Sequence, residues 1–186
     1  MSPPARGIIR PARPSDVPAV VRMVHDLAAY ERAPEQCHLT EERLSAALFA
    51  ERPAVHAHLA LLAGEPVGFA LWFLNFSTWE GVPGIYLEDL YVSPAARGTG
   101  LGRRLLATLA ALCVERGYRR LDWWMLRWNP AGDFYATIGA KPMDEWVPYR
   151  LSGAGLAELA AHAAPDGRPA GRVPSREEAP GDPDHA

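Results

Sequence analysis

Apolar residues follow two periodicities along this chain, and the switches between them predict its helices and strands. In the helical segments apolar side chains recur about every 3.6 residues and so share one face. The predicted longer helices cover residues 17–30, 41–49 and 101–116. Segments rich in β-branched, leucine and aromatic residues are typical of strands. They lie at residues 7–10, 56–62, 67–75, 85–92 and 119–126.

Capping and turn residues predict where these elements begin and end. Ser15 or Asp16 can cap the first helix, and Thr40 can cap the second. Gly117 is placed to end the third helix, because glycine readily takes the left-handed conformation found there. Residues 63–66 have the composition of a hairpin turn. Residues 76–84 are expected to form a loop, so that the three central strands make an antiparallel meander.

The last part of the predicted fold comprises a short helix and a final strand. Asn129-Pro130 should start a helix that contains Phe134-Tyr135 and that Gly139 ends. Residues 141–151 are expected to supply a last strand or hairpin. The resulting order of elements predicts an α/β (α+β) protein with a single mixed, mostly antiparallel sheet and helices on both faces.

Length and composition indicate one globular domain, expected at residues 5–151. The chain has 186 residues, of which 48% are apolar and 22% charged, with a net charge of −3. This charge gives no indication of a nucleic-acid or membrane surface. Residues 152–186 are expected to be a tail, largely disordered beyond about 165, since its composition is dominated by Ala, Pro, Gly and charged residues. With no apolar leader or span and two cysteines in unrelated contexts, a cytoplasmic protein is expected.

Candidate chemistry appears where the strand at 85–92 passes into the helix that starts near residue 101. Gly98, Gly100 and Gly102 precede or open that helix. The first turn of a helix has unpaired backbone N–H groups and the positive end of the helix dipole, and glycines let those amides approach an anion closely. Arg97 and Arg103 add positive charge, and Arg104 follows them. A phosphorylated ligand is therefore expected, with an ordinary glycine-rich turn that caps a core helix as the alternative.

The spacing of these glycines shows which of the known nucleotide-binding patterns the loop can match. The dinucleotide pattern G-x-G-x-x-G fails because Arg103 stands at its last position, and no Gly-Lys-Ser/Thr of a P-loop is present. The pattern Arg97-x-x-Gly100-x-Gly102 instead resembles the acyl-coenzyme A pyrophosphate loop of the GNAT acetyltransferases. Together with Tyr86-Leu87-Glu88-Asp89 before it, the chain is similar to the diamine (spermidine/spermine) and thialysine acetyltransferase branch. The resemblance spans about residues 8–151 and implies acetyl-CoA as cosubstrate, no metal, and a homodimer.

Transfer of an acetyl group from a thioester to an amine needs a base, oxyanion donors and a proton for the departing thiolate. Tyr135 is the candidate acid, because a phenol with a pKa of about 10 is protonated at neutral pH. Its place in the Phe-Tyr…Gly-Ala helix matches the general acid of the family. Glu88 is the candidate base, acting through a water molecule. Strand alternation puts Glu88 and Asp89 on opposite faces, so that they cannot both serve one site. The resemblance implies the amine-facing role for Glu88, alongside Leu90 and Val92 on the same side, and Asp89 is then expected to have a structural role.

Each catalytic candidate has a structural alternative. Tyr135 could be a buried side chain that packs on the sheet, and Glu88 could belong to an ion pair. The resemblance supplies the remaining positions. The expected acetyl-CoA contacts are Leu90, Tyr91, Val92, Arg97, Gly98, Thr99, Gly100, Leu101, Gly102, Arg103, Asn129 and Tyr135. The spacing between Asn129 and Pro130 is one residue shorter than is usual in the family.

The amine pocket is expected to combine carboxylates with aromatic faces, which attract a cation. The residues that match the family's substrate positions are Tyr30, Glu31, Glu88, Asp122, Trp123, Trp124 and Glu145. The tryptophans have core packing as their alternative. Ser77 stands where the polyamine enzymes have an acidic residue, which makes a short diamine or a lysine-like amino acid at least as plausible as a long polyamine.

The expected activity is direct acetyl transfer to a small primary amine in a ternary complex. Acetylation of a protein N-terminus or lysine is one alternative, and a non-catalytic acyl-CoA-binding module is another. His56 and His58 share one strand face, as a metal pair would, but no third ligand has helpful spacing. They are interpreted as structural or exposed.

Overall fold

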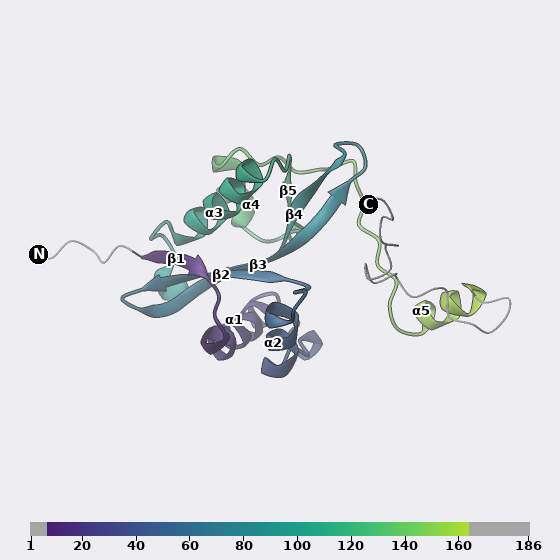
Figure 1. Cartoon of the computed structure of the whole chain (residues 1–186), viewed down its shortest axis with the longest axis horizontal. Helices are drawn as coiled ribbons and strands as arrows, with labels where there is room; N and C mark the ends of the chain where they lie inside the picture. Colours follow the sequence, from purple (N-terminus) through teal and green to yellow (C-terminus); the bar gives the residue numbers. More distant parts are fainter. Residues whose placement is uncertain (1–6, 164–186) are drawn as a thin grey trace, which may run out of the picture. The chain divides into compact units, whose positions relative to one another are not determined.

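A computed structural model describes residues 7–163 of the chain, and these form two compact units that are divided between residues 140 and 141 (Figure 1). Each unit is described by itself. The candidate residues other than Glu145 belong to the first unit. The predicted domain limits of 5–151 and 152–186 stay a prediction, and the expected disorder beyond about residue 165 lies outside the described residues.

The first unit is built on one five-stranded sheet with the strands in chain order. The strands are β1 (Ile8–Pro11), β2 (His56–Leu62), β3 (Glu65–Ser77), β4 (Val82–Val92) and β5 (Leu121–Asp122). The pairs β1–β2, β2–β3 and β3–β4 are antiparallel, and β4–β5 is parallel. This confirms the predicted meander and the mixed, mostly antiparallel sheet.

Helices cover both faces of this sheet, as the sequence predicted (Figure 1). They are α1 (Val17–Tyr30), α2 (Glu41–Phe49), α3 (Leu101–Glu115) and α4 (Ala131–Thr137), and α5 (Gly153–Ala160) follows in the second unit. One-turn 3-10 helices occur at Pro14–Asp16, Pro34–Gln36, Pro94–Ala96 and Ala161–Ala163. Among the described residues, no helix combines the length and the apolar character needed to cross a bilayer.

Two hydrophobic cores, one on each face, hold the helices to the sheet. On one face Val20 of α1 and Leu44 of α2 are buried together with Phe69 of β3. On the other face the apolar stripe of α3, with Leu105 and Leu109 fully buried, packs on the sheet. Burial of apolar surface stabilises the fold by about 25 cal/mol per Å². The apolar stripes that the sequence predicted therefore hold α1 and α3 against the sheet.

The predicted cap at Thr40 is confirmed, whereas Asp16 occupies the N-cap position of α1, as one of the two predicted alternatives, without a side-chain capping hydrogen bond. The Thr40 hydroxyl accepts a hydrogen bond from the Arg43 N–H at 3.3 Å and so caps α2. The Asp16 carboxylate does not cap α1; it accepts two hydrogen bonds from the Arg10 guanidinium, at 2.6 and 2.8 Å, and one from the Arg13 N–H at 2.7 Å. It therefore ties β1 to the turn before α1, and these partners lower the pKa of Asp16.

Three expectations about strands are wrong. The loop expected at 76–84 is a short turn, because β3 runs to Ser77 and β4 starts at Val82. The strand expected at 119–126 is limited to two residues. Residues 141–151 form neither a strand nor a hairpin. A strand exists only with a hydrogen-bonded partner, and no strand in the described part of the chain pairs with these segments beyond β5.

Candidate active site

The glycine loop between β4 and α3 has the backbone geometry of an anion site. Gly98 and Gly100 have φ values of +79° and +82°, in the left-handed region that favours glycine. A Cβ atom added to either would have no atom within 4 Å, so the space beside the loop is open. Gly100 is the N-cap of α3 and gives no side-chain cap. Since no described residue accepts a hydrogen bond from the first amides of α3, the loop fits a diphosphate such as that of acetyl-CoA.

The arginines around this loop have different roles. Arg103 is exposed. The Nη1 of Arg104 donates to the Gly7 carbonyl at 2.6 Å, so this guanidinium is held near the N-terminal strand. The Nε of Arg97 donates to the Val92 carbonyl at 3.2 Å, and its Cζ lies 5.2 Å from the centroid of the Tyr30 ring. Arg97 thus joins the loop to the end of α1.

Beside the loop, β4 separates from β5. The two strands pair only at Ile85 with Leu121 and at Tyr86 with Asp122. No strand in the described chain therefore pairs with Leu87–Val92 on that side. Three residues in this stretch are expected to contact acetyl-CoA, and they lie on different faces of the sheet. Leu90 and Val92 pack on the α3 side, and Tyr91 is buried on the α1 side. Backbone N–H groups without a strand partner in this stretch are candidate oxyanion donors.

A β-bulge changes the expected orientation of Glu88 and Asp89. Leu71 of β3 is paired with Asp89, whereas the next residue, Trp72, is paired with Leu87, so Glu88 is an extra residue in β4. Alternation is interrupted there, so it no longer assigns Glu88 to the side of Leu90 and Val92, and that placement stays a prediction; Glu88 is exposed. Asp89 shares the face of Leu71, which α1 and α2 cover. The purely structural role expected for Asp89 has no ion pair or hydrogen bond to support it among the described residues.

Three carboxylates meet at this point without a cation. Burial, together with the charges of Glu88 and Glu31, raises the pKa of Asp89 to about 7. Burial also raises the pKa of Glu31, which follows the last residue of α1. In the part of the chain that the structure describes, the ion pairs are Arg10–Asp16, Arg119–Glu80 and Arg120–Asp122, so none involves these three carboxylates. An incoming ammonium would relieve the repulsion among them.

Tyr135, which comes from α4, is within electrostatic reach of one of these carboxylates, Glu31. Its ring is 4.9 Å from that of Trp123 and 5.3 Å from that of Phe134, centroid to centroid. Burial raises the pKa of the Tyr135 phenol, and the charge of Glu31 adds to this effect. The phenol therefore stays protonated at neutral pH, as a proton donor must. Glu31 is thus the common neighbour of Asp89 and Tyr135.

Aromatic rings and guanidinium groups alternate next to Glu31. The Tyr30 and Trp128 rings are 5.9 Å apart, and the Cζ of Arg32 lies 4.8 Å from the Trp128 centroid. Trp128 and Arg32 were missed as site residues in the sequence. The signal for Trp128 was weak, because it is one of three tryptophans in a short aromatic segment. Arg32 directly follows the Tyr30-Glu31 pair, which had been recognised.

The other expected substrate and cofactor residues have varied surroundings. The Asp122 carboxylate accepts a hydrogen bond from the Asn75 side-chain amide at 3.1 Å and forms an ion pair with Arg120 at 3.0 Å. These contacts give Asp122 a structural role in β5. Trp124 is exposed and contacts Tyr86 edge-on at 6.1 Å. The side-chain Oδ1 of Asn129 accepts a hydrogen bond from the Ala131 N–H at 3.0 Å, at the start of α4. Ligand contacts by these residues, and by Glu145 in the second unit, stay predictions.

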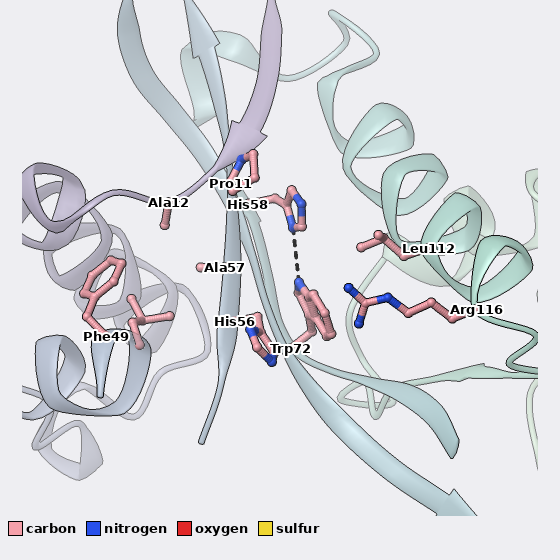
Figure 2. Close-up of a pocket in the computed structure, with 10 residues that line it drawn as sticks. Pro11, Ala12, Phe49, His56, Ala57, His58, Trp72, Leu112 and Arg116 are labelled. Atoms are coloured by element: carbon pink, nitrogen blue, oxygen red, sulfur yellow. Dashed lines mark hydrogen bonds between the residues drawn. The ribbon is translucent and has the colours of Figure 1, made fainter. Parts of the chain in front are cut away.

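A cavity of about 270 Å³ lies elsewhere, between the sheet, α2 and the end of α3 (Figure 2). Its lining includes His56, His58 and Trp72 but none of the candidate catalytic residues. The buried His58 Nδ1 accepts a hydrogen bond from Trp72 Nε1 at 3.1 Å, and burial lowers the pKa of His58. The structural interpretation of His58 is thereby confirmed. Residues 7–163 contain no group of three or more potential ligands arranged around a metal position.

Comparison with known proteins identifies the class. Residues 21–140 match the Acetyltransferase (GNAT) family. The chain is 36% identical over 165 residues to a thialysine N-epsilon-acetyltransferase of Sus scrofa, covering 82% of this chain and 96% of that protein. It is 28% identical to an L-ornithine N5-acetyltransferase of Arabidopsis thaliana, covering 80% and 85%. A solved integron cassette protein of V. cholerae has a TM-score of 0.70 and 31% identity, covering 83% of this chain and 97% of that one.

The chain therefore belongs to the GNAT family of acetyltransferases. This confirms the resemblance read from the glycine loop, and with it the predicted fold and enzyme class.

Proposed function

We propose that this enzyme transfers an acetyl group from acetyl-CoA to the side-chain amine of a lysine-like amino acid or to a small diamine. The observation that carries the proposal is the unpaired cluster of Glu31, Glu88 and Asp89 beside Tyr135 and the open glycine loop. The thialysine and ornithine specificities of the relatives support it. Acetyl-CoA supplies the thioester, and its diphosphate fits the amides of Gly98–Gly102 and the charge of Arg103.

The first step is loss of a proton from the substrate ammonium. The carboxylates attract the ammonium, and Glu88 accepts its proton through a water molecule. Asp89 keeps a negative charge next to Glu88 above pH 7 and thereby favours this transfer. The neutral amine then attacks the thioester carbon, and backbone amides of Leu90–Val92 stabilise the oxyanion that forms.

The second step is departure of the thiolate. After the attack the substrate nitrogen carries two protons and a positive charge, and it gives one of these protons to water. The carbon–sulfur bond breaks as the amide forms, and the Tyr135 hydroxyl donates its proton to the sulfur. Water passes the nitrogen proton back to the Tyr135 phenolate, and the proton bound by Glu88 returns to solvent as the one proton released per turnover. Both substrates are present together, and no acyl-enzyme intermediate occurs. The Trp123 ring, tilted against that of Tyr135, keeps the phenol ring in place.

We also propose a homodimer located in the cytoplasm. Large apolar side chains are exposed between residues 141 and 151 in the second unit, which supports contact with another chain. They are Met143, Trp146, Val147, Tyr149 and Leu151. The free cysteines Cys37 and Cys113 fit a reducing compartment. Light scattering coupled to gel filtration measures the mass of the assembly directly.

A thiol-release assay tests the proposed activity. The purified full chain is incubated with acetyl-CoA and a panel of diamines, polyamines, lysine analogues and peptides, and free coenzyme A is measured. Release with small amines is expected. Release only with peptides would show a protein acetyltransferase, and tight acetyl-CoA binding without release from any acceptor would show a non-catalytic module; either result contradicts the proposal.

A further inference from the structure

We propose that Arg32 binds the α-carboxylate of an amino-acid substrate and thereby selects such amino acids over diamines of the same length. This inference rests on the proposed function and names the residue that sets its specificity. The reacting amine is assigned to the carboxylates that include Glu31. Arg32 directly follows Glu31 in the chain, so its guanidinium is placed to meet the far end of such a substrate.

The position of Arg32 is set by its neighbours on both sides. Its side chain is exposed, and its Cζ lies 4.8 Å from the centroid of the Trp128 ring, which is itself 45% exposed. Trp128 contacts Tyr30, the residue before Glu31. A guanidinium that lies over an aromatic ring keeps the N–H groups of its own plane free to bind a carboxylate with two parallel hydrogen bonds.

The backbone of Arg32 fixes where this side chain begins. Arg32 has a φ of +63°, which is uncommon for a residue with a Cβ atom. Its N–H donates to the Ala29 carbonyl at 3.1 Å, and the following N–H of Ala33 donates to Ala28 at 3.0 Å. The turn after α1 is thus held by hydrogen bonds, so that binding requires little further ordering of the backbone.

Charge decides which substrate this arrangement favours. In the described chain Arg32 has no carboxylate partner, while Glu31, Glu88 and Asp89 have no cation. A diamine brings an ammonium at each end, and its second ammonium would meet the positive charge of Arg32. A lysine-like amino acid brings an ammonium to the carboxylates and a carboxylate to Arg32. Its charges therefore complement both ends of the site.

The neighbouring cations are less suited to this role. Arg97 is held by the Val92 carbonyl and the Tyr30 ring beside the diphosphate loop. Arg127 is exposed and adjoins Trp128 in the chain, but it makes none of the ring contacts or ion pairs found among the described residues. It provides a matched control, because its replacement removes the same charge from the same region.

The experiment compares each amino acid with its own decarboxylated form. Thialysine and lysine are paired with the diamines that remain when their carboxylates are removed, and kcat/KM is measured for the wild type, Arg32→Gln, Arg32→Lys and Arg127→Gln. The wild type is expected to prefer the amino acids. Arg32→Gln should reduce that preference by on the order of 10- to 100-fold, the effect of losing a hydrogen bond to a charged group. The loss should lie in KM, and Arg32→Lys should retain part of the preference.

The outcomes separate this inference from the proposed function. A wild type that acetylates diamines as well as amino acids would overturn the role of Arg32 and leave the acetyltransferase activity intact. The same would follow if Arg32→Gln kept the wild-type preference or if Arg127→Gln reduced it equally. Absence of thiol release with every amine would overturn the proposed function and this inference with it.

Discussion

Replacement of Asp89 by Asn tests the electrostatics of the carboxylate cluster. Asn has nearly the shape of Asp and reproduces its uncharged form. Since burial and the charges of Glu88 and Glu31 raise the pKa of Asp89 to about 7, only about one molecule in ten carries that charge at pH 6. The kcat/KM of the wild type for the amine should therefore fall about 10-fold from its plateau to pH 6.

In Asp89→Asn the fall in kcat/KM toward pH 6, which is the acid limb of the pH profile, should disappear. The profile is expected to be flat between pH 6 and 8, at a level at least about 10-fold below the wild-type plateau, because the variant lacks the charge at every pH. Glu88→Gln should lower the plateau by roughly 10²-fold or more, as expected for loss of a general base. The assay is thiol release with saturating acetyl-CoA, and Glu115→Gln, an exposed acid at the end of α3, is the control.

Stability measurements separate this effect from unfolding. The raised pKa means that the folded protein binds a proton at Asp89 more tightly than the unfolded chain, whose value is near 3.8. Folded stability from this group is therefore present below pH 3.8 and is lost as pH rises to about 7, by up to about 4 kcal/mol. Asp89→Asn should consequently be more stable than the wild type at pH 8. An unchanged acid limb in Asp89→Asn, or a lower Tm at pH 8, would refute the reasoning.

Three further predictions concern the acid, the loop and the core. Tyr135→Phe should lower kcat by roughly 10²- to 10⁴-fold and leave acetyl-CoA binding intact, since the ring stays and only the proton donor is lost; a variant with full kcat would contradict this. Gly100→Ala should raise the KM for acetyl-CoA by about 10-fold, because a Cβ atom enters the open space and strains the positive φ; Gly64→Ala, with a φ of +89° and similar open space, should not change that KM. His58→Phe should lower the free energy of unfolding by about 1–3 kcal/mol, because Trp72 Nε1 loses its acceptor, and denaturant unfolding would show no change if that bond were unimportant.

Features that depend on local chemistry could be predicted from the sequence. The stripe of leucines in α3 and the glycines before it lie within one short segment, and each acts through its own backbone or its own helix face. The pattern around Arg97 therefore indicated an anion site at a helix start, and the structure places open space and uncapped amides there. The hairpin of β2 and β3 was found for the same reason.

Features that depend on a distant partner could not be predicted in this way. Residues 119–126 have the composition of a strand, yet only Leu121–Asp122 pairs, because β4 offers hydrogen-bonding partners only at Ile85 and Tyr86. Residues 141–151 have the same kind of composition and no partner in the described chain. Composition reports that a segment fits a sheet, whereas the strand forms only if another strand is there.

The bulge at Glu88 shows how one inserted residue defines the site. Without it, alternation would put Glu88 and Asp89 on opposite faces, and a single carboxylate would face α1. With it, Asp89 lies on the face of α1, next to Glu31, and its charge is felt by both neighbours. Burying this charge lowers the stability of the fold. The strand keeps its position despite this because β4 is anchored on both sides of the bulge. Leu87 is buried in the core beneath α3, and Tyr91 in the core beneath α1 and α2. The two cores thus hold the strand firmly enough for repulsion among the carboxylates to act on an incoming ammonium instead of displacing the backbone.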